Sequence, residues 1–263
     1  MDNGVLLGLG FIAVIFYIVL GTNPNAGLFI HPESIMVVLG GTVSATLICF
    51  PMDNLKKFGY RFKAFMREDK LVYAKNITTL IQIAEKIKIK GALAVSEEVE
   101  ALEDPFMKTG FKLIIDNTPE ERIDALLCEV MDHMEKRHTV SAGFFDQMAK
   151  FAPGYGLIGT LIGLILLMAT LSDPSSLGPS MAIALVTTFY GSFLANVIFT
   201  PLAGRLKASS KQEMIDKELI LIGIKAVARG ESSIIIKETM LMFFAGKDQK
   251  VLLEAFENEK NSA

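Results

Sequence analysis

Hydroxyl groups supply most of the polar chemistry in two long uncharged stretches of this chain, residues 151–171 and 177–204. Thr160 lies in the first stretch, and Thr187 and Thr188 are neighbours in the second. A hydroxyl donates and accepts hydrogen bonds, but it does not titrate near neutral pH. Neither stretch contains the carboxylates or histidines with which membrane proteins relay protons. If this chain moves ions, another component must supply the titrating group.

Small residues in the same stretches recur at every fourth position, a spacing that lets two helices approach closely. The pairs are Gly159 with Gly163 and Gly191 with Ala195. The pattern has two interpretations. It packs this chain's own helices, or it lines an interface for a partner's helix with the three threonines turned towards it.

Two prolines stand near the ends of these stretches. Pro153 suits the start of a helix. Pro201 follows Thr200 deep in an apolar run, where a proline removes a backbone donor and kinks the helix. Such a kink serves static packing or a hinge, and the sequence leaves both open.

Other reactive groups form no recognisable active site. His133 and His138 are five residues apart, which separates them around a helix. Neither a serine–histidine–aspartate set nor a phosphate-binding glycine–lysine motif stands out. Cys49 and Cys128 lack the spacing of a metal site or a redox pair. The sequence predicts no enzyme, no metal site and no cofactor.

The whole chain is too apolar for an ordinary soluble domain. Of its 263 residues, 51% are hydrophobic, and the mean hydropathy is +0.42. Because about 20 apolar residues cross a bilayer as a helix, four stretches qualify as transmembrane helices. They cover residues 4–21, 35–50, 151–171 and 177–204, the second extending upstream past Glu33.

Positive charge gives these spans a direction. Of the 26 Lys and Arg residues, 16 lie in residues 52–150 and 10 in residues 205–263. The links 22–34 and 172–176 contain none. Because cytoplasmic segments are rich in Lys and Arg, we expect both termini in the cytoplasm.

The cytoplasmic parts are expected to be helical. The segment TPEE at 118–121 has the residue types of a helix start. No proline interrupts residues 120–152, so one long helix is expected to run towards the third span. Further helices are expected at about 70–90 and at 206–228, the latter ending near Gly230.

The predicted fold is therefore an all-α integral membrane protein with four transmembrane helices, a large helical cytoplasmic domain and a helical C-terminal tail. The predicted domains are residues 1–51 with the first two spans, 52–150 in the cytoplasm, 151–204 with the last two spans, and the cytoplasmic helices of 205–263.

Several segments resemble one known family. They are AKFAPGYGLIGTLIGLI at 149–165, GPSMAIALVTTFYGSFLANVIFTPLAGRL at 178–206, SIMVVLGGT at 34–42, KGALAVSEEVE at 90–100 and FMKTGFKLIID at 106–116. In this order they are similar to segments of the MotA/PomA family, the A subunit of the bacterial flagellar stator. The resemblance covers nearly the whole chain, and it implies that the chain lies in the bacterial inner membrane.

The resemblance implies a complex of several A chains, with five around two copies of a B subunit. The B subunit has one span that carries an aspartate, and a periplasmic domain that grips peptidoglycan. That aspartate would be the titrating group that this chain lacks. Passage of Na⁺ or H⁺ past it would drive the A subunits against the switch complex of the rotor.

The resemblance also implies roles for single residues. Pro153 and Pro201 match two prolines that couple ion flow to motion. Thr188 matches a threonine near the ion path, which Thr187 adjoins, and Thr160 matches one that is typical of sodium-type members. His31 departs from the pattern, since sodium-type members have an aspartate there. On balance the sequence favours sodium.

The rotor contact implied by the resemblance lies around Gly91. Lysines precede this glycine and carboxylates follow it; the candidates are Lys88, Lys90, Glu97, Glu98 and Glu100. The alternative interpretation is a solvated helix surface. Some members have an arginine where Glu97 stands here.

Three other functions fit the sequence less well. The related ExbB/TolQ class of proton-driven envelope energisers shares the two inner spans, but its members typically have three spans. A membrane enzyme would need the active site that the sequence lacks. A self-sufficient channel would need a charged ring along its pore.

Overall fold

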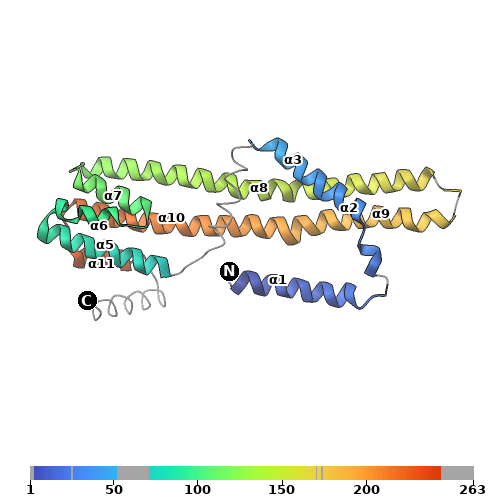
Figure 1. Ribbon diagram of the computed structural model, residues 1–263, viewed down its shortest axis with the longest axis horizontal. Coiled ribbons are helices and arrows are strands. Elements are labelled where there is room, and N and C mark those ends of the chain that lie inside the picture. The colour runs from blue at the N-terminus through green and yellow to red at the C-terminus, as the bar shows by residue number, and fades with distance from the viewer. Residues whose placement is uncertain (1–2, 25, 52–70, 170, 173, 244–263) are drawn as a thin grey trace. The chain divides into compact units, whose positions relative to one another are not determined.

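The computed structural model describes residues 3–24, 26–51, 71–169, 171–172 and 174–243. All regular elements in these residues are helices (Figure 1). Residues 52–70 and 244–263, which belong to the predicted cytoplasmic parts, lie outside the described residues. The chain divides into two compact units, each built from two separate stretches. This division follows contacts and not a membrane boundary, so the predicted domain limits stay a prediction.

The first unit comprises residues 1–68 and 137–209. Its N-terminal elements are α1 (Asn3–Phe16), the π-helical η1 (Tyr17–Gly21), the 3-10 turn η2 (Ala26–Phe29), α2 (Pro32–Ile35), the π-helical η3 (Met36–Gly40) and α3 (Gly41–Cys49). Of these, α2 and η3 pack on α9 (Pro174–Phe193), and Gly41 of α3 lies against Tyr155 of α8 (Glu120–Ala169). In addition, the ring of Phe16 lies 4.8 Å from the ring of Phe193.

The second unit comprises residues 69–136 and 210–263. Its elements include α5 (Leu71–Lys90), the 3-10 turn η4 (Ala92–Val95), α6 (Ser96–Glu100), α7 (Pro105–Ile115) and α11 (Ser233–Leu241). They surround one apolar core with parts of α8 and α10 (Thr200–Ala228). Fully buried members of this core include Leu80, Val99, Phe111, Leu127 and Ile224.

Two helix ends show why the chain turns where it does. Asn117 follows α7 with a φ of 54°, and Gly230 follows α10 with a φ of 72°. After each, the next amide donates to a carbonyl five residues back, as Thr118 does to Leu113 and Glu231 to Ala226. This left-handed helix end suits glycine and asparagine.

The expected long helix is confirmed: α8 runs without a break for 50 residues. The helices predicted near 70–90 and 206–228 are confirmed as α5 and α10. Pro153 does not start a helix, because it lies well inside α8. Pro153 is exposed there and offers no backbone amide to the helix.

Three helical stretches of the described chain are long and apolar enough to cross a membrane. They are Ala26–Cys49, Glu120–Ala169 and Leu177–Ala228. The first of these includes the upstream extension expected past Glu33. Near the N-terminus the apolar helix Gly10–Val19 is shorter than a span, so the count of four spans stays a prediction.

Candidate functional site

The glycines of α8 and α9 bring the backbones of these two helices into contact. A methyl group added at Gly159 would lie 2.6 Å from Cβ of Thr187. One added at Gly163 would lie 2.8 Å from the backbone nitrogen of Ala184, and one at Gly191 would lie 2.6 Å from the carbonyl oxygen of Ala152. These distances are shorter than van der Waals contact. The glycine pattern therefore packs this chain's own helices, the first of its two interpretations.

Thr160 and Thr188 meet across this contact. Their hydroxyl oxygens are hydrogen-bonded to each other. The Thr160 hydroxyl also lies 3.1 Å from the carbonyl oxygen of Gly156 and 3.0 Å from that of Ala184. A hydroxyl donates only one proton at a time. When Thr160 donates to a carbonyl, Thr188 donates to Thr160, and both oxygens keep lone pairs for a further ligand.

Thr187 points elsewhere. Its side chain is 1% exposed and packs against Gly159. Its hydroxyl lies 3.0 Å from the carbonyl oxygen of Ile183 and 2.9 Å from that of Ala184. The expectation that all three threonines turn towards a partner is therefore corrected for Thr187, which is enclosed between α8 and α9.

Thr160 and Thr188 each belong to a stripe of residues at helical spacing. The α8 stripe is Pro153, Leu157, Thr160, Leu164 and Met168. The second stripe continues from α9 into the π-helical η5 (Leu194–Phe199) and consists of Met181, Leu185, Thr188, Ser192 and Asn196. All ten are exposed except Thr160, which is half-buried.

We call these two stripes the hydroxyl face. It is apolar along most of its length, with oxygen ligands at one level and the Asn196 amide, bonded to the Ser192 carbonyl at 2.9 Å, further along. Residues 151–169 and 174–204 contain no Asp, Glu, Lys, Arg or His. The face can solvate a cation through neutral oxygens, but it cannot take up a proton near neutral pH.

Pro201 lies in the first turn of α10, directly after the widened turns of η5. The amide of Thr200 bonds to the carbonyl of Ala195, five residues back. Proline offers no amide of its own, and a π-helical turn is a frequent adjustment at functional positions in helices. The structure thus places an irregular backbone segment where the sequence predicted a kink.

The last turn of α9 is tied to the segment between η2 and α2. The hydroxyl of Tyr190 donates to the carbonyl of Phe29 and accepts the backbone amide of His31 at 3.3 Å. The Nδ1 atom of His31 accepts the amide of Ser34 at 3.3 Å. His31 therefore caps α2. Capping accounts for this residue without a role on the hydroxyl face.

The predicted rotor-contact residues divide into two groups. Glu98 pairs with Lys86 at 2.7 Å. Glu100 pairs with Lys108 at 2.6 Å and with Lys112 at 2.5 Å; hydrogen bonds from these two lysines lower the pKa of Glu100 to about 2. By contrast, Lys88, Lys90 and Glu97 are exposed and form no ion pair within the described part of the chain.

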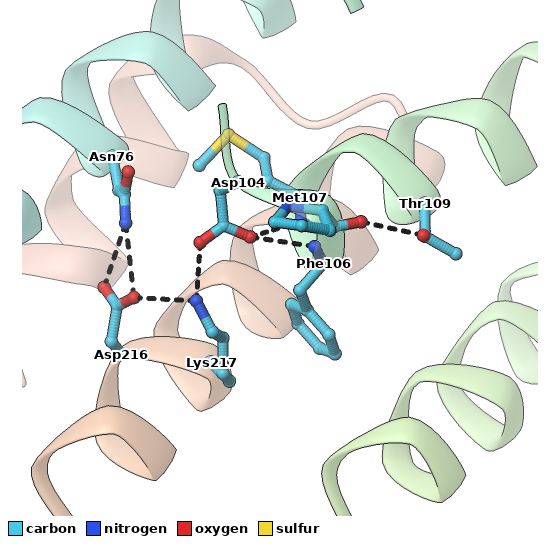
Figure 2. Close-up of polar contacts among 8 residues, drawn as sticks. Asn76, Asp104, Phe106, Met107, Thr109, Asp216 and Lys217 are labelled. Carbon is cyan, nitrogen blue, oxygen red and sulfur yellow. Dashed lines mark hydrogen bonds and ion pairs between the residues drawn. The ribbon is translucent and has the colours of Figure 1, made fainter. Parts of the chain in front are cut away.

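A largely buried polar network lies in the second unit, and sequence reasoning missed it (Figure 2). Lys217 of α10 is 7% exposed and donates to Asp104 at 2.5 Å and to Asp216 at 3.3 Å. The amide of Asn76 donates to Asp216 at 3.2 Å. The other oxygen of Asp104 caps α7 through the amides of Phe106, at 2.8 Å, and Met107, at 3.0 Å.

Burial and charge act in opposite directions on this network. Burial raises the pKa of Asp216, although Lys217 and Asn76 counteract it. Burial would lower the pKa of Lys217, but the charge and hydrogen bond of Asp104 raise it overall. Lys217 is therefore held as a cation between two carboxyl groups. An Asp-Pro pair at the start of α7 is a helix-start signal that could have identified Asp104.

No group of three or more metal-ligating side chains was found in the described residues. For the described residues, the fold and the site together define a helical membrane protein whose hydroxyl face has no ionisable group of its own.

Comparison with known proteins agrees with this class. A profile of the MotA/TolQ/ExbB proton channel family matches residues 98–218. Motility protein A of Borreliella burgdorferi is 33% identical over 245 residues, which cover 93% of this chain and 94% of that protein. Chemotaxis protein PomA of Vibrio alginolyticus is 35% identical over 246 residues, 90% of this chain and 92% of that protein.

The solved structure of the flagellar MotAB stator complex from Bacillus subtilis matches with a TM-score of 0.86 and 29% identity, over 94% of this chain and 98% of the matched chain. The chain therefore belongs to the MotA/TolQ/ExbB proton channel family, in its motility protein A group.

Proposed function

We propose that this chain is the A subunit of a flagellar stator, a cation-conducting complex that generates the torque for flagellar rotation. The observation that carries the proposal is the hydroxyl face, where Thr160 and Thr188 meet on an exposed apolar surface without a carboxylate. Membership of the motility protein A group supports it.

A partner completes the ion path in this proposal. A B subunit supplies one membrane span with an aspartate, and its periplasmic domain binds peptidoglycan. The aspartate takes up the cation, and the hydroxyl face replaces part of the water that the cation loses. The A chain itself has no cofactor and is not an enzyme; the translocated ion is its substrate.

The assembly follows from the same interpretation. Several A chains, five by resemblance, surround a B dimer. Each A chain crosses the bacterial inner membrane four times, with both termini and the second unit in the cytoplasm. There the segment around Gly91 contacts the rotor switch protein. Pro153 on the hydroxyl face and Pro201 after η5 transmit ion passage to the helices that extend from the membrane.

The experiment that tests this function is deletion of the gene in its source organism, with filming of cells whose flagella are stained. Flagella that are intact but paralysed, and that turn again when the gene is restored, are the expected result. Speed measured with and without sodium then identifies the ion.

Normal swimming in a strain with no second stator would overturn the proposal and favour an energiser of the ExbB/TolQ class. That class predicts a different loss on deletion, in transport across the envelope or in its integrity. The two functions are therefore separated by the phenotype of one strain.

A further inference from the structure

Two large apolar side chains are exposed beside Gly91. Ile89, at the end of α5, is 80% exposed, and Leu93, in η4, is 78% exposed. Nearby apolar residues are buried instead, with Val95 at 1% and Val99 at 0%. Isolated exposed leucines are common. Ile89 and Leu93 are only four residues apart, and so at most about 14 Å from each other, and the charged residues Lys88, Lys90 and Glu97 are close to them in sequence.

The backbone holds this pair in a fixed setting. Gly91 ends α5 with a φ of 85°, a conformation that side chains with a Cβ rarely adopt. An ion pair joins the two sides of the turn, with Nζ of Lys86 2.7 Å from Oε2 of Glu98. Val95 and Val99 anchor it in the core of the second unit. Ile89 and Leu93 are therefore presented by a turn that is already ordered, which lowers the entropy lost on binding.

The charges around the pair form no ion pair with other described residues. Lys88 and Lys90 flank Ile89, and Glu97 follows Leu93, while the neighbouring Glu98 and Glu100 are neutralised by lysines of this chain. An apolar centre with a polar, charged rim is the usual anatomy of a protein–protein interface. Charges at the rim raise association rates and select partners, and the buried centre carries most of the binding free energy.

We propose that Ile89 and Leu93 are the apolar anchor of the contact with the rotor, and that Lys88, Lys90 and Glu97 steer the approach. The proposal rests on the stator function above. Its occupant is a protein surface with an apolar hollow, acidic groups opposite the two lysines and a basic group opposite Glu97. The anchor predicts a contact that survives high salt, which a contact of charges alone would not.

The test measures binding of the detergent-solubilised A–B complex to the purified rotor switch complex of the same organism. Binding is compared at ionic strengths with Debye lengths of about 10 Å and about 3 Å. We expect Ile89→Ala with Leu93→Ala to weaken binding about tenfold at both ionic strengths. We expect Lys88→Glu with Lys90→Glu to weaken binding at low salt only.

The matched control is Ile234→Ala with Met242→Ala, two apolar residues of the same unit that are 68% and 79% exposed. This control should bind as the wild type does. Co-purification of the B subunit with the anchor variant shows that the complex still assembles. Wild-type binding by the anchor variant at both ionic strengths would overturn the proposal.

Failure of the stator function looks different. In that case the wild-type chain binds no rotor complex at either ionic strength, and cells that lack the gene swim normally. That result would overturn the anchor together with the function, whereas loss of binding by the charge variant alone, at both ionic strengths, would overturn the anchor only.

Discussion

Thr160 is the residue at which the choice of ion is best tested. Its hydroxyl is within hydrogen-bond distance of the Thr188 hydroxyl and of two carbonyl oxygens. A bare alkali cation would therefore find several neutral oxygens close together. A proton transferred between carboxylate and water needs no such set. We expect Thr160→Ala to reduce the dependence of swimming speed on sodium. Speed measured against external sodium checks this, with Thr187→Ser, which keeps the enclosed hydroxyl, as the control.

An unchanged sodium dependence in Thr160→Ala would exclude Thr160 from ion selection.

The Thr187 position shows why the sequence alone could not separate these residues. Thr187 and Thr188 are about 100° apart around one helix, and the absence of a side chain at Gly159, on another helix, determines which of them is enclosed.

Lys217 is the residue on which the stability of the second unit depends most clearly. Lys217→Met leaves the buried Asp216 and the half-buried Asp104 without their cation. Loss of one partner from a buried ion pair costs about 3–5 kcal/mol. The free energy of unfolding, measured by pulse proteolysis of the purified complex in urea, should fall by that amount.

Two further variants make this prediction specific. Lys225→Met breaks a more exposed pair with Asp124 and should cost about 1 kcal/mol or less. Adding Asp104→Asn to Lys217→Met removes one stranded charge and keeps a residue that can cap α7, so part of the lost stability should return. A Lys217→Met complex as stable as the wild type would contradict the ion-pair argument.

At the scale of elements, the contact between α8 and α9 depends on the missing side chain at Gly191. An added Cβ would meet the Ala152 carbonyl at 2.6 Å and the Gly156 Cα at 2.9 Å. Both are backbone atoms, so the helices must separate. We expect Gly191→Ala to destabilise the complex by about 1–3 kcal/mol. Gly178→Ala, in the same helix with nothing within 4 Å, should be neutral or slightly stabilising.

Thermal unfolding of the two alanine variants, purified with the B subunit, checks the prediction for this helix pair. Equal melting temperatures would mean that the helices tolerate a wider separation. A lower value for Gly191→Ala alone, together with reduced swimming, would link the spacing of α8 and α9 to the hydroxyl face that they carry.

The elements themselves were largely predictable from local patterns. Apolar spacing and the absence of proline indicated α5, α8 and α10, and Gly230 marked the end of the last. The expectation that Pro153 starts a helix was wrong, because the local sequence looks the same whether a helix begins at a proline or continues through it. The structure shows that α8 continues through Pro153.

At the scale of the whole molecule, long-range contacts were beyond local reasoning. Lys217 meets Asp104 across 113 positions of sequence, and Asn76 meets Asp216 across 140. Each of these residues is polar or charged, and its own segment gives no sign that it is not on a solvated surface. Only the fold brings them together, so the network as a whole had no sequence signal, although the Asp-Pro pair at the start of α7 marked Asp104 as a helix start.

Ion conduction should belong to the assembly and not to this chain. Residues 151–169 and 174–204 have no ionisable carboxylate, amine or imidazole, and an apolar pore without charge or a continuous line of polar groups opposes ion entry. In liposomes, we expect the purified chain alone to give the background rate of sodium and proton uptake. Liposomes with both subunits should conduct, and conduction should be lost when the B-subunit aspartate is replaced by alanine. Conduction by the chain alone would instead make it a self-sufficient channel, with the hydroxyl face as its pore.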